Sequence, residues 1–165
     1  MKSRSNGHTD PDDIGKIKTL YQNLLESWNN NNPEEFSQLF TTDGNSIGFD
    51  GSQMNGQKQI RDELDKIFQN HKVSSYVGII REIRTLSSTV FVLRAIAGMI
   101  PPGRDVIKPD VNAIQTLIAK RQGDEFRITL FQNTPAAFHG RPEAVSEMTN
   151  ELQKAYDDGV KNHKG

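Results

Sequence analysis

The sequence contains no cysteine among its 165 residues. This absence excludes disulfide bonds, thiolate metal ligands and cysteine nucleophiles. The chain also lacks an excess of either charge, since 20 Lys and Arg side chains stand against 21 Asp and Glu side chains. A protein that binds the phosphate backbone usually carries a basic surface, so we expect no nucleic-acid partner.

Long hydrophobic runs are absent as well. No window approaches the roughly 18 apolar residues of a membrane span, so we expect no membrane segment. The opening stretch MKSRSNGHTDPDD lacks the apolar centre of a secretory signal, which leads us to expect a cytoplasmic protein. The four histidines form no H-x-H or H-E-x-x-H motif, so the sequence predicts neither a metal site nor a cofactor.

The first 70 residues carry the signals of three helices. A cap at Asp10, followed by proline, begins a helix whose apolar side chains recur at steps of three and four up to Trp28. A second, short helix begins after a similar cap at Asn32. A third occupies about residues 56–70, and the polar residues 1–9 are expected to form a flexible tail.

After residue 71 the apolar period changes from 3.6 to 2, which is typical of strands. Tight turns join these strands, and a last amphipathic helix follows from about residue 142. Helices and antiparallel strands that are segregated along the chain predict an α+β fold. We expect a main domain at residues 10–140 and a C-terminal helix and tail at residues 141–165.

Three segments together carry a family resemblance: LLESWNNNNPEEFSQLFTTDG, FDGSQMNGQKQIRDEL and FRITLFQNTPAAFHGRPE. Over residues 12–142 the chain resembles the nuclear-transport-factor-2-like (NTF2-like) superfamily, and within it the SnoaL-like, SgcJ/EcaC branch. The resemblance implies a cone-shaped fold, in which a strongly curved antiparallel sheet wraps around the N-terminal helices and leaves a pocket at its open end. It also implies a homodimer formed through the outer surface of the sheet, with the C-terminal helix as an extension.

Arg94 is the odd residue on an otherwise apolar face of its predicted strand. An isolated buried guanidinium is very costly, so it needs a partner or a wet cavity. One interpretation is an arginine that binds or orients an anion in the pocket. The other, which we favour, is an ion pair with Glu82 or with another carboxylate on a neighbouring strand.

Two amides also interrupt apolar faces. Gln115 alternates with apolar residues along one strand, and Gln132 shares the face of the apolar residues of the next strand, which are Phe126, Ile128 and Leu130. A buried glutamine needs partners for both its carbonyl and its amino group. Both side chains are therefore candidates to line a pocket, although Gln132 is equally suited to tie down the loop that follows.

The resemblance brings Trp28, Phe49 and Met54 toward the expected pocket, where they would form an apolar cavity. In the ketosteroid-isomerase relatives a carboxylate base precedes the third helix, but the matching positions here are Ile47 or Gly48, and neither can act.

Two groups remain as possible acid or base. Asp50 is the nearest carboxylate, although its turn predicts exposure, and His71 follows the third helix. We therefore predict a binding module for a small hydrophobic or carbonyl-containing molecule. The alternatives are an isomerase, lyase or cyclase, and a protein-interaction module.

Overall fold

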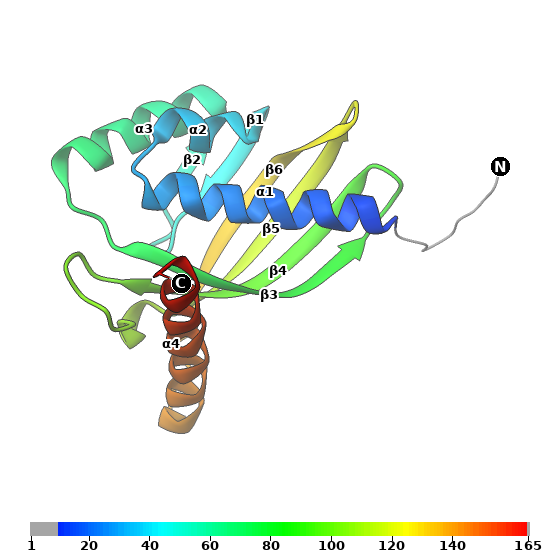
Figure 1. Cartoon of the computed structure of the whole chain (residues 1–165). Coiled ribbons are helices and arrows are strands. Elements are labelled where there is room, and N and C mark those ends of the chain that lie inside the picture. Colours follow the sequence, from blue (N-terminus) through cyan, green and yellow to red (C-terminus); the bar gives the residue numbers. More distant parts are fainter. Residues whose placement is uncertain (1–9, 165) are drawn as a thin grey trace.

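The computed structural model describes residues 10–164, which fold into one curved six-stranded sheet with helices on both of its faces (Figure 1). The expected tail at residues 1–9 lies outside the described residues. The helices are α1 (Pro11–Asn29), α2 (Pro33–Gln38), α3 (Gln57–Asn70) and α4 (Pro142–Lys164), with a short 3₁₀ turn at Pro109–Val111. The strands are β1 (Phe40–Ile47), β2 (Gln53–Asn55), β3 (Ser75–Thr85), β4 (Val90–Ile100), β5 (Ala113–Gln122) and β6 (Glu125–Pro135).

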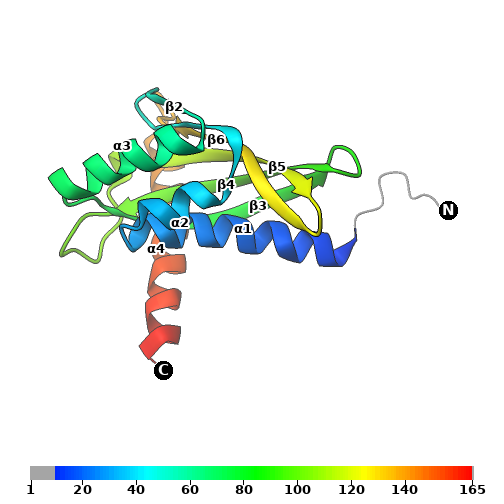
Figure 2. The same ribbon diagram turned by 90° about the horizontal axis from the view of Figure 1, so that it is seen from above.

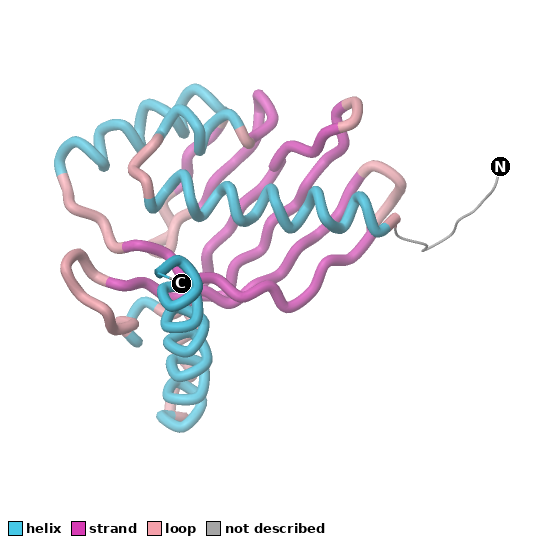
Figure 3. Tube along the Cα trace, viewed as in Figure 1, coloured by secondary structure: helices cyan, strands magenta, loops and turns pink. Residues whose placement is uncertain are grey.

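The strands are arranged in the order β2-β1-β6-β5-β4-β3, and Figure 3 shows how strongly this sheet curves. All neighbours pair antiparallel except β1 and β6, which run parallel. The predicted α+β class and curved sheet are confirmed. The parallel pair departs from the purely antiparallel sheet that we expected.

Helix α1 lies across the concave face of the sheet because its apolar stripe matches that face. Its start is fixed by Asp10, whose side chain accepts a hydrogen bond from the backbone N–H of Asp12 at 2.9 Å. The start of α2 is fixed in the same way by Asn32 and the N–H of Glu35, 3.0 Å apart. Side chains from α1, α2, α3 and the inner sheet face then form the main core, which includes Ile17, Leu24, Ile60, Leu64, Leu93, Leu117 and Ile128.

A β-bulge in β6 decides which of its side chains face this core. Ile118 pairs with Leu130, but the next residue of β5, Ala119, pairs with Ile128, so Thr129 is the extra residue. A bulge of one residue moves every later side chain to the other face of the sheet. Ile128 is buried before the bulge, and the residues buried after it are Phe131 and Asn133.

Helix α4 packs on the opposite face of the sheet from α1. Figure 2, seen from above, shows it passing beneath the sheet, with its C-terminal end projecting beyond α1. Met148 and Leu152 form a second apolar cluster with Ile96 and Ile100 of β4. No helix within residues 10–164 has the length and apolar character needed to cross a membrane.

Candidate functional site

A cavity of about 310 Å³ lies between the C-terminal end of α1, helix α3, the loop between β1 and β2, and the sheet. Its walls are mainly apolar, with a few polar groups from the sheet and from the loop between β1 and β2. The lining residues are Trp28, Phe36, Ser46, Gly48, Phe49, Asp50, Ser52, Met54, Leu64, Ile67, Tyr76, Met99, Phe131 and Asn133. Enclosed apolar hollows with a few converging polar groups are typical of small-molecule sites.

The aromatic wall of the cavity is held by the end of α1. The Trp28 ring lies 5.2 Å from Phe68 and 5.3 Å from Tyr76 between centroids, and its Nε1 donates to the carbonyl of Ser74 at 2.9 Å. The neighbouring Asn29 side chain accepts from the Tyr76 N–H at 2.7 Å and donates to the Tyr76 carbonyl at 3.1 Å. These bonds fix the start of β3, and with it Tyr76, against the cavity.

The polar wall is tied to a buried chain of hydrogen bonds. The Tyr21 hydroxyl donates to Gln115 Oε1 at 2.6 Å, and Gln115 Nε2 donates to Asn133 Oδ1 at 2.7 Å. The neighbouring Asn133 amide interacts with the Tyr76 hydroxyl. Burial raises the pKa of Tyr76 to about 12, although this interaction opposes the shift. Burial also raises the pKa of Tyr21 above its ordinary value, so both phenols are neutral at physiological pH.

The structure brings only some of the predicted site residues together. Trp28, Phe49, Met54 and Asp50 line the cavity. Gln115 is fully buried behind its polar wall and reaches it only through Asn133. Arg94, Gln132 and His71 lie elsewhere.

Arg94 points away from the cavity, on the outer face of β4. Its Nε and Nη2 donate to Glu82 Oε1 at 2.9 and 2.7 Å, and 56% of its side chain is exposed. Hydrogen bonds from Arg84 and then from Arg94 lower the pKa of the Glu82 carboxyl. The interpretation of Arg94 as an anion-binding pocket residue is therefore wrong, and the ion pair with Glu82 is what forms.

Gln132 is also absent from the cavity, because the bulge at Thr129 reverses the alternation that places it beside Ile128 in the sequence. Asn133 takes the expected position instead. His71 is exposed at the end of α3 and does not line the cavity either.

Asp50 is exposed at the cavity wall, as its turn predicts. Its Oδ1 accepts the Ser52 N–H at 2.9 Å. Hydrogen bonds from Ser52 lower the pKa of this carboxyl, which is the opposite of what a general base requires.

The sequence reasoning missed Tyr76, Asn133 and Ser46 as lining residues. Tyr76 could have been proposed from the sequence, because it is a tyrosine at the start of a strand. Asn133 could not have been, because its place on the cavity side depends on the bulge in β6.

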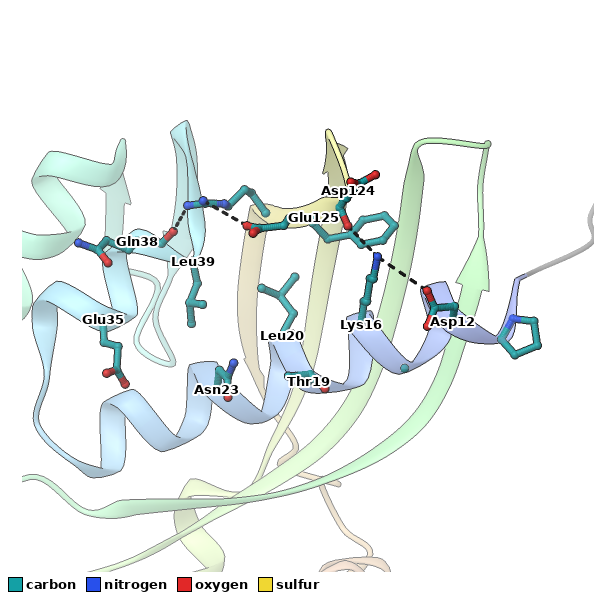
Figure 4. A pocket seen from close by; sticks show the side chains of 14 residues that line it. Asp12, Lys16, Thr19, Leu20, Asn23, Glu35, Gln38, Leu39, Asp124 and Glu125 are labelled. Carbon is teal, nitrogen blue, oxygen red and sulfur yellow. Dashed lines mark hydrogen bonds and ion pairs between the residues drawn. The ribbon is translucent and has the colours of Figure 1, made fainter.

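A second hollow of about 690 Å³ lies between the N-terminal half of α1, α2 and the turn between β5 and β6 (Figure 4). We call it the α1 groove. Its cations are paired within its own walls. Lys16 Nζ donates to the carbonyl of Asp124 at 2.8 Å and lies 3.8 Å from Asp12, while Arg127 donates to the carbonyl of Gln38. Within the part of the chain described, no three His, Asp or Glu side chains gather to hold a metal ion.

No protein-family model matches the sequence, and no curated protein sequence matches it. Solved structures do share its architecture. A domain of unknown function with a cystatin-like fold from Nostoc punctiforme is 19% identical, with a TM-score of 0.74 over 94% of this chain and 99% of the other. An NTF2-like protein of unknown function from Shewanella oneidensis is 16% identical, with a TM-score of 0.60 over 74% of this chain and 98% of the other.

The chain has the NTF2-like fold. A candidate scytalone dehydratase from Novosphingobium aromaticivorans has the same architecture, with 14% identity and a TM-score of 0.62 over 76% of this chain and 85% of the other. At these identities the similarity shows the NTF2-like fold alone, so function has to be argued from the side chains of the cavity.

Proposed function

We propose that this protein binds a small, neutral and largely apolar molecule in the cavity. The observation that carries the proposal is a partly open hollow whose apolar walls, formed by residues such as Trp28, Met54 and Phe131, meet polar side chains that include Tyr76 and Asn133. Apolar walls supply binding energy through burial, and a few polar groups orient the ligand. Assignment to the SnoaL-like, SgcJ/EcaC branch remains a proposal that rests on the sequence motifs.

An isomerase, lyase or cyclase has less support. Such chemistry needs an acid or base within hydrogen-bonding reach of the substrate. Asp50 lines the cavity with a lowered pKa, and His71 lies outside it. The candidate scytalone dehydratase shares the fold but is only 14% identical. Binding without acid–base catalysis therefore accounts for the site better.

Fluorescence of Trp28, the single tryptophan of the chain, tests the proposal directly because its ring lines the cavity. We expect cyclooctanone, a neutral ketone that does not absorb with tryptophan, to change this emission in a saturable way. Gly48→Phe should abolish the response by filling the cavity. Gly48 tolerates a side chain, since an added Cβ would meet its nearest neighbour, Asp50 Oδ1, at 3.5 Å.

The matched control is Gly15→Phe. Gly15 lines the α1 groove, and a Cβ there meets nothing within 4 Å. The proposal predicts that this variant retains the response. Loss of the response in Gly15→Phe and not in Gly48→Phe would move the binding site to the α1 groove, and no response in the wild type would refute binding of this class of molecule.

We further propose that two copies associate through the outer sheet face. Val92, Ile118 and Leu130 are paired with one another across β4, β5 and β6, and all three are partly exposed. They do not belong to the cluster that α4 covers. A row of apolar side chains that no helix or strand within residues 10–164 covers supports an interface between copies of the chain.

A further inference from the structure

The buried hydrogen bonds between Tyr21 and Asn133 form a chain with a direction. Each amide can present either its oxygen or its nitrogen to a neighbour, so two opposite arrangements satisfy the Gln115–Asn133 contact. In the arrangement of the structure, Tyr21 donates to Gln115 and Gln115 donates to Asn133. Asn133 therefore has its carbonyl oxygen occupied, and its NH₂ group is the part that remains for Tyr76 and the cavity.

The burial of Tyr21 selects this direction. Its side chain is 2% exposed, and Gln115 is the one hydrogen-bond partner of its hydroxyl within residues 10–164. If the chain ran the other way, Gln115 would donate to the Tyr21 oxygen and the Tyr21 proton would be left in the core without an acceptor. An unsatisfied buried donor is costly, whereas the observed direction leaves the spare proton on Tyr76, which faces the cavity.

The consequence for the cavity is a polar wall made of donors. Because Gln115 occupies the Asn133 oxygen, Asn133 presents its NH₂ group toward Tyr76 and the cavity, and the Tyr76 O–H has no acceptor in Asn133 and can donate to a ligand. We propose that Tyr21 and Gln115, which do not line the cavity, orient Asn133 and Tyr76 as donors, so that the cavity selects neutral ligands with an acceptor oxygen, such as ketones, aldehydes or lactones. This inference rests on the proposed function, since it concerns the same cavity.

The carboxylate of Asp50 should also make the cavity select against negatively charged ligands. Its carboxylate lines the same cavity and its hydrogen bonds with Ser52 favour the charged form. A carboxylate ligand also accepts hydrogen bonds, but it would bring a second negative charge beside Asp50 into an apolar hollow. Moving a charge from water into an apolar hollow is costly, and repulsion from the exposed Asp50 adds a smaller penalty because water screens it, so the cavity should distinguish a neutral carbonyl from an acid of the same shape.

The test uses three probes with one ring system: indane, 1-indanone and indane-1-carboxylate. Calorimetry gives their affinities for the wild type and for Gln115→Met, which keeps the side-chain length but removes the amide. Without Gln115, the Asn133 oxygen is free to accept the Tyr76 proton, and the cavity loses its donors. We expect the affinity of 1-indanone relative to indane to fall about fivefold to tenfold, the usual worth of a net hydrogen bond or slightly more.

An infrared measurement separates loss of these donors from general loosening. The carbonyl stretch of bound 1-indanone should lie at a lower wavenumber in the wild type than in Gln115→Met, because an accepted hydrogen bond weakens the C=O bond. Gln122→Met is the matched control, since Gln122 lies at the exposed end of the same strand. It should change neither the affinity ratio nor the carbonyl frequency. Should Gln115→Met fail to fold, Tyr21→Phe removes the same directional bias and should lower the ratio at least twofold.

The outcomes separate the two proposals. If the wild type binds neither indane nor 1-indanone, the proposed function fails and this inference fails with it. If the wild type binds the probes and the ratio is the same in the variants that fold, the cavity is a binding site but Tyr21 and Gln115 do not set its polarity. Binding of indane-1-carboxylate as tightly as 1-indanone would overturn the selection against acids.

Discussion

The amide nitrogen of Gln115 lies 2.7 Å from the carbonyl oxygen of Asn133, where the first side chain is 0% and the second 6% exposed. This bond joins the interior of the core to the wall of the cavity. A mutation behind the cavity therefore acts on the polar groups that a ligand would meet. We therefore expect stability and ligand preference to be linked at this one contact.

Replacement of Gln115 by methionine should lower the free energy of unfolding by at least about 1 kcal/mol. The change leaves the Tyr21 hydroxyl without its acceptor, whereas the Asn133 oxygen can turn to the Tyr76 hydroxyl, and one unsatisfied buried group costs about 1–3 kcal/mol. Urea denaturation measures the loss. Gln122→Met, on the exposed end of the same strand, should stay within about 0.5 kcal/mol of the wild type, and equal losses in both variants would contradict the hydrogen-bond chain.

The burial of Tyr76 predicts a loss of stability at high pH. Its pKa is raised from 10.0 to about 12 in the folded protein, so the unfolded chain releases this proton first. The stabilising contribution is complete below pH 10 and is lost as the pH rises from about 10 to about 12. Burial also raises the pKa of Tyr21, so this residue likewise contributes to a loss of stability at high pH. Urea midpoints measured across this window should fall less steeply in Tyr76→Phe than in the wild type, and identical slopes would show that Tyr76 does not titrate in this way.

The close approach of α1 to β3 requires the absence of a side chain at Gly78. A Cβ at this position would lie 2.3 Å from the Tyr21 hydroxyl oxygen and 2.7 Å from Leu25 Cδ1. Gly78→Ala should therefore destabilise the protein by about 1–3 kcal/mol through overpacking. Gly15→Ala should instead stabilise the protein by about 0.5–1 kcal/mol, because Gly15 is an exposed helical residue with open space around it. Thermal denaturation measures the stability of both variants. A Gly78→Ala variant as stable as the wild type would contradict the close packing of α1 on β3.

Association through the outer sheet face predicts a dimer mass for the wild type at micromolar concentration. Ile118→Lys places a charge in the middle of the row formed with Val92 and Leu130, and burying that charge in an interface is costly. Light scattering should then give the mass of one chain. A monomeric wild type, or a variant that remains dimeric, would refute an interface on this face.

The sequence predicted the helices well because their signals are local. Asp10 and Asn32 cap α1 and α2 in the structure, and the apolar stripe of α1 is the buried one. The ion pair between Arg94 and Glu82 also followed from the cost of an isolated charge. These predictions depend on residues a few positions apart or on neighbouring strands.

The wrong predictions concern features that depend on strand register and on which strands pair. The alternation of β6 predicts Gln132 on the face of Ile128, but the bulge at Thr129 gives that face to Asn133. Nothing in the residue pattern marks this extra residue. The parallel pairing of β1 with β6 joins segments that are far apart in the chain, and side-chain alternation does not specify a strand's partner.

Anomalous diffraction from crystals soaked in 5-bromo-1-indanone tests whether the cavity beside Trp28 is the ligand site. We expect a bromine peak among Trp28, Met54 and Phe131, with the ketone oxygen directed at Tyr76 and Asn133. A bromine peak in the α1 groove beside Leu20 and Leu39, with none in the cavity, would contradict it.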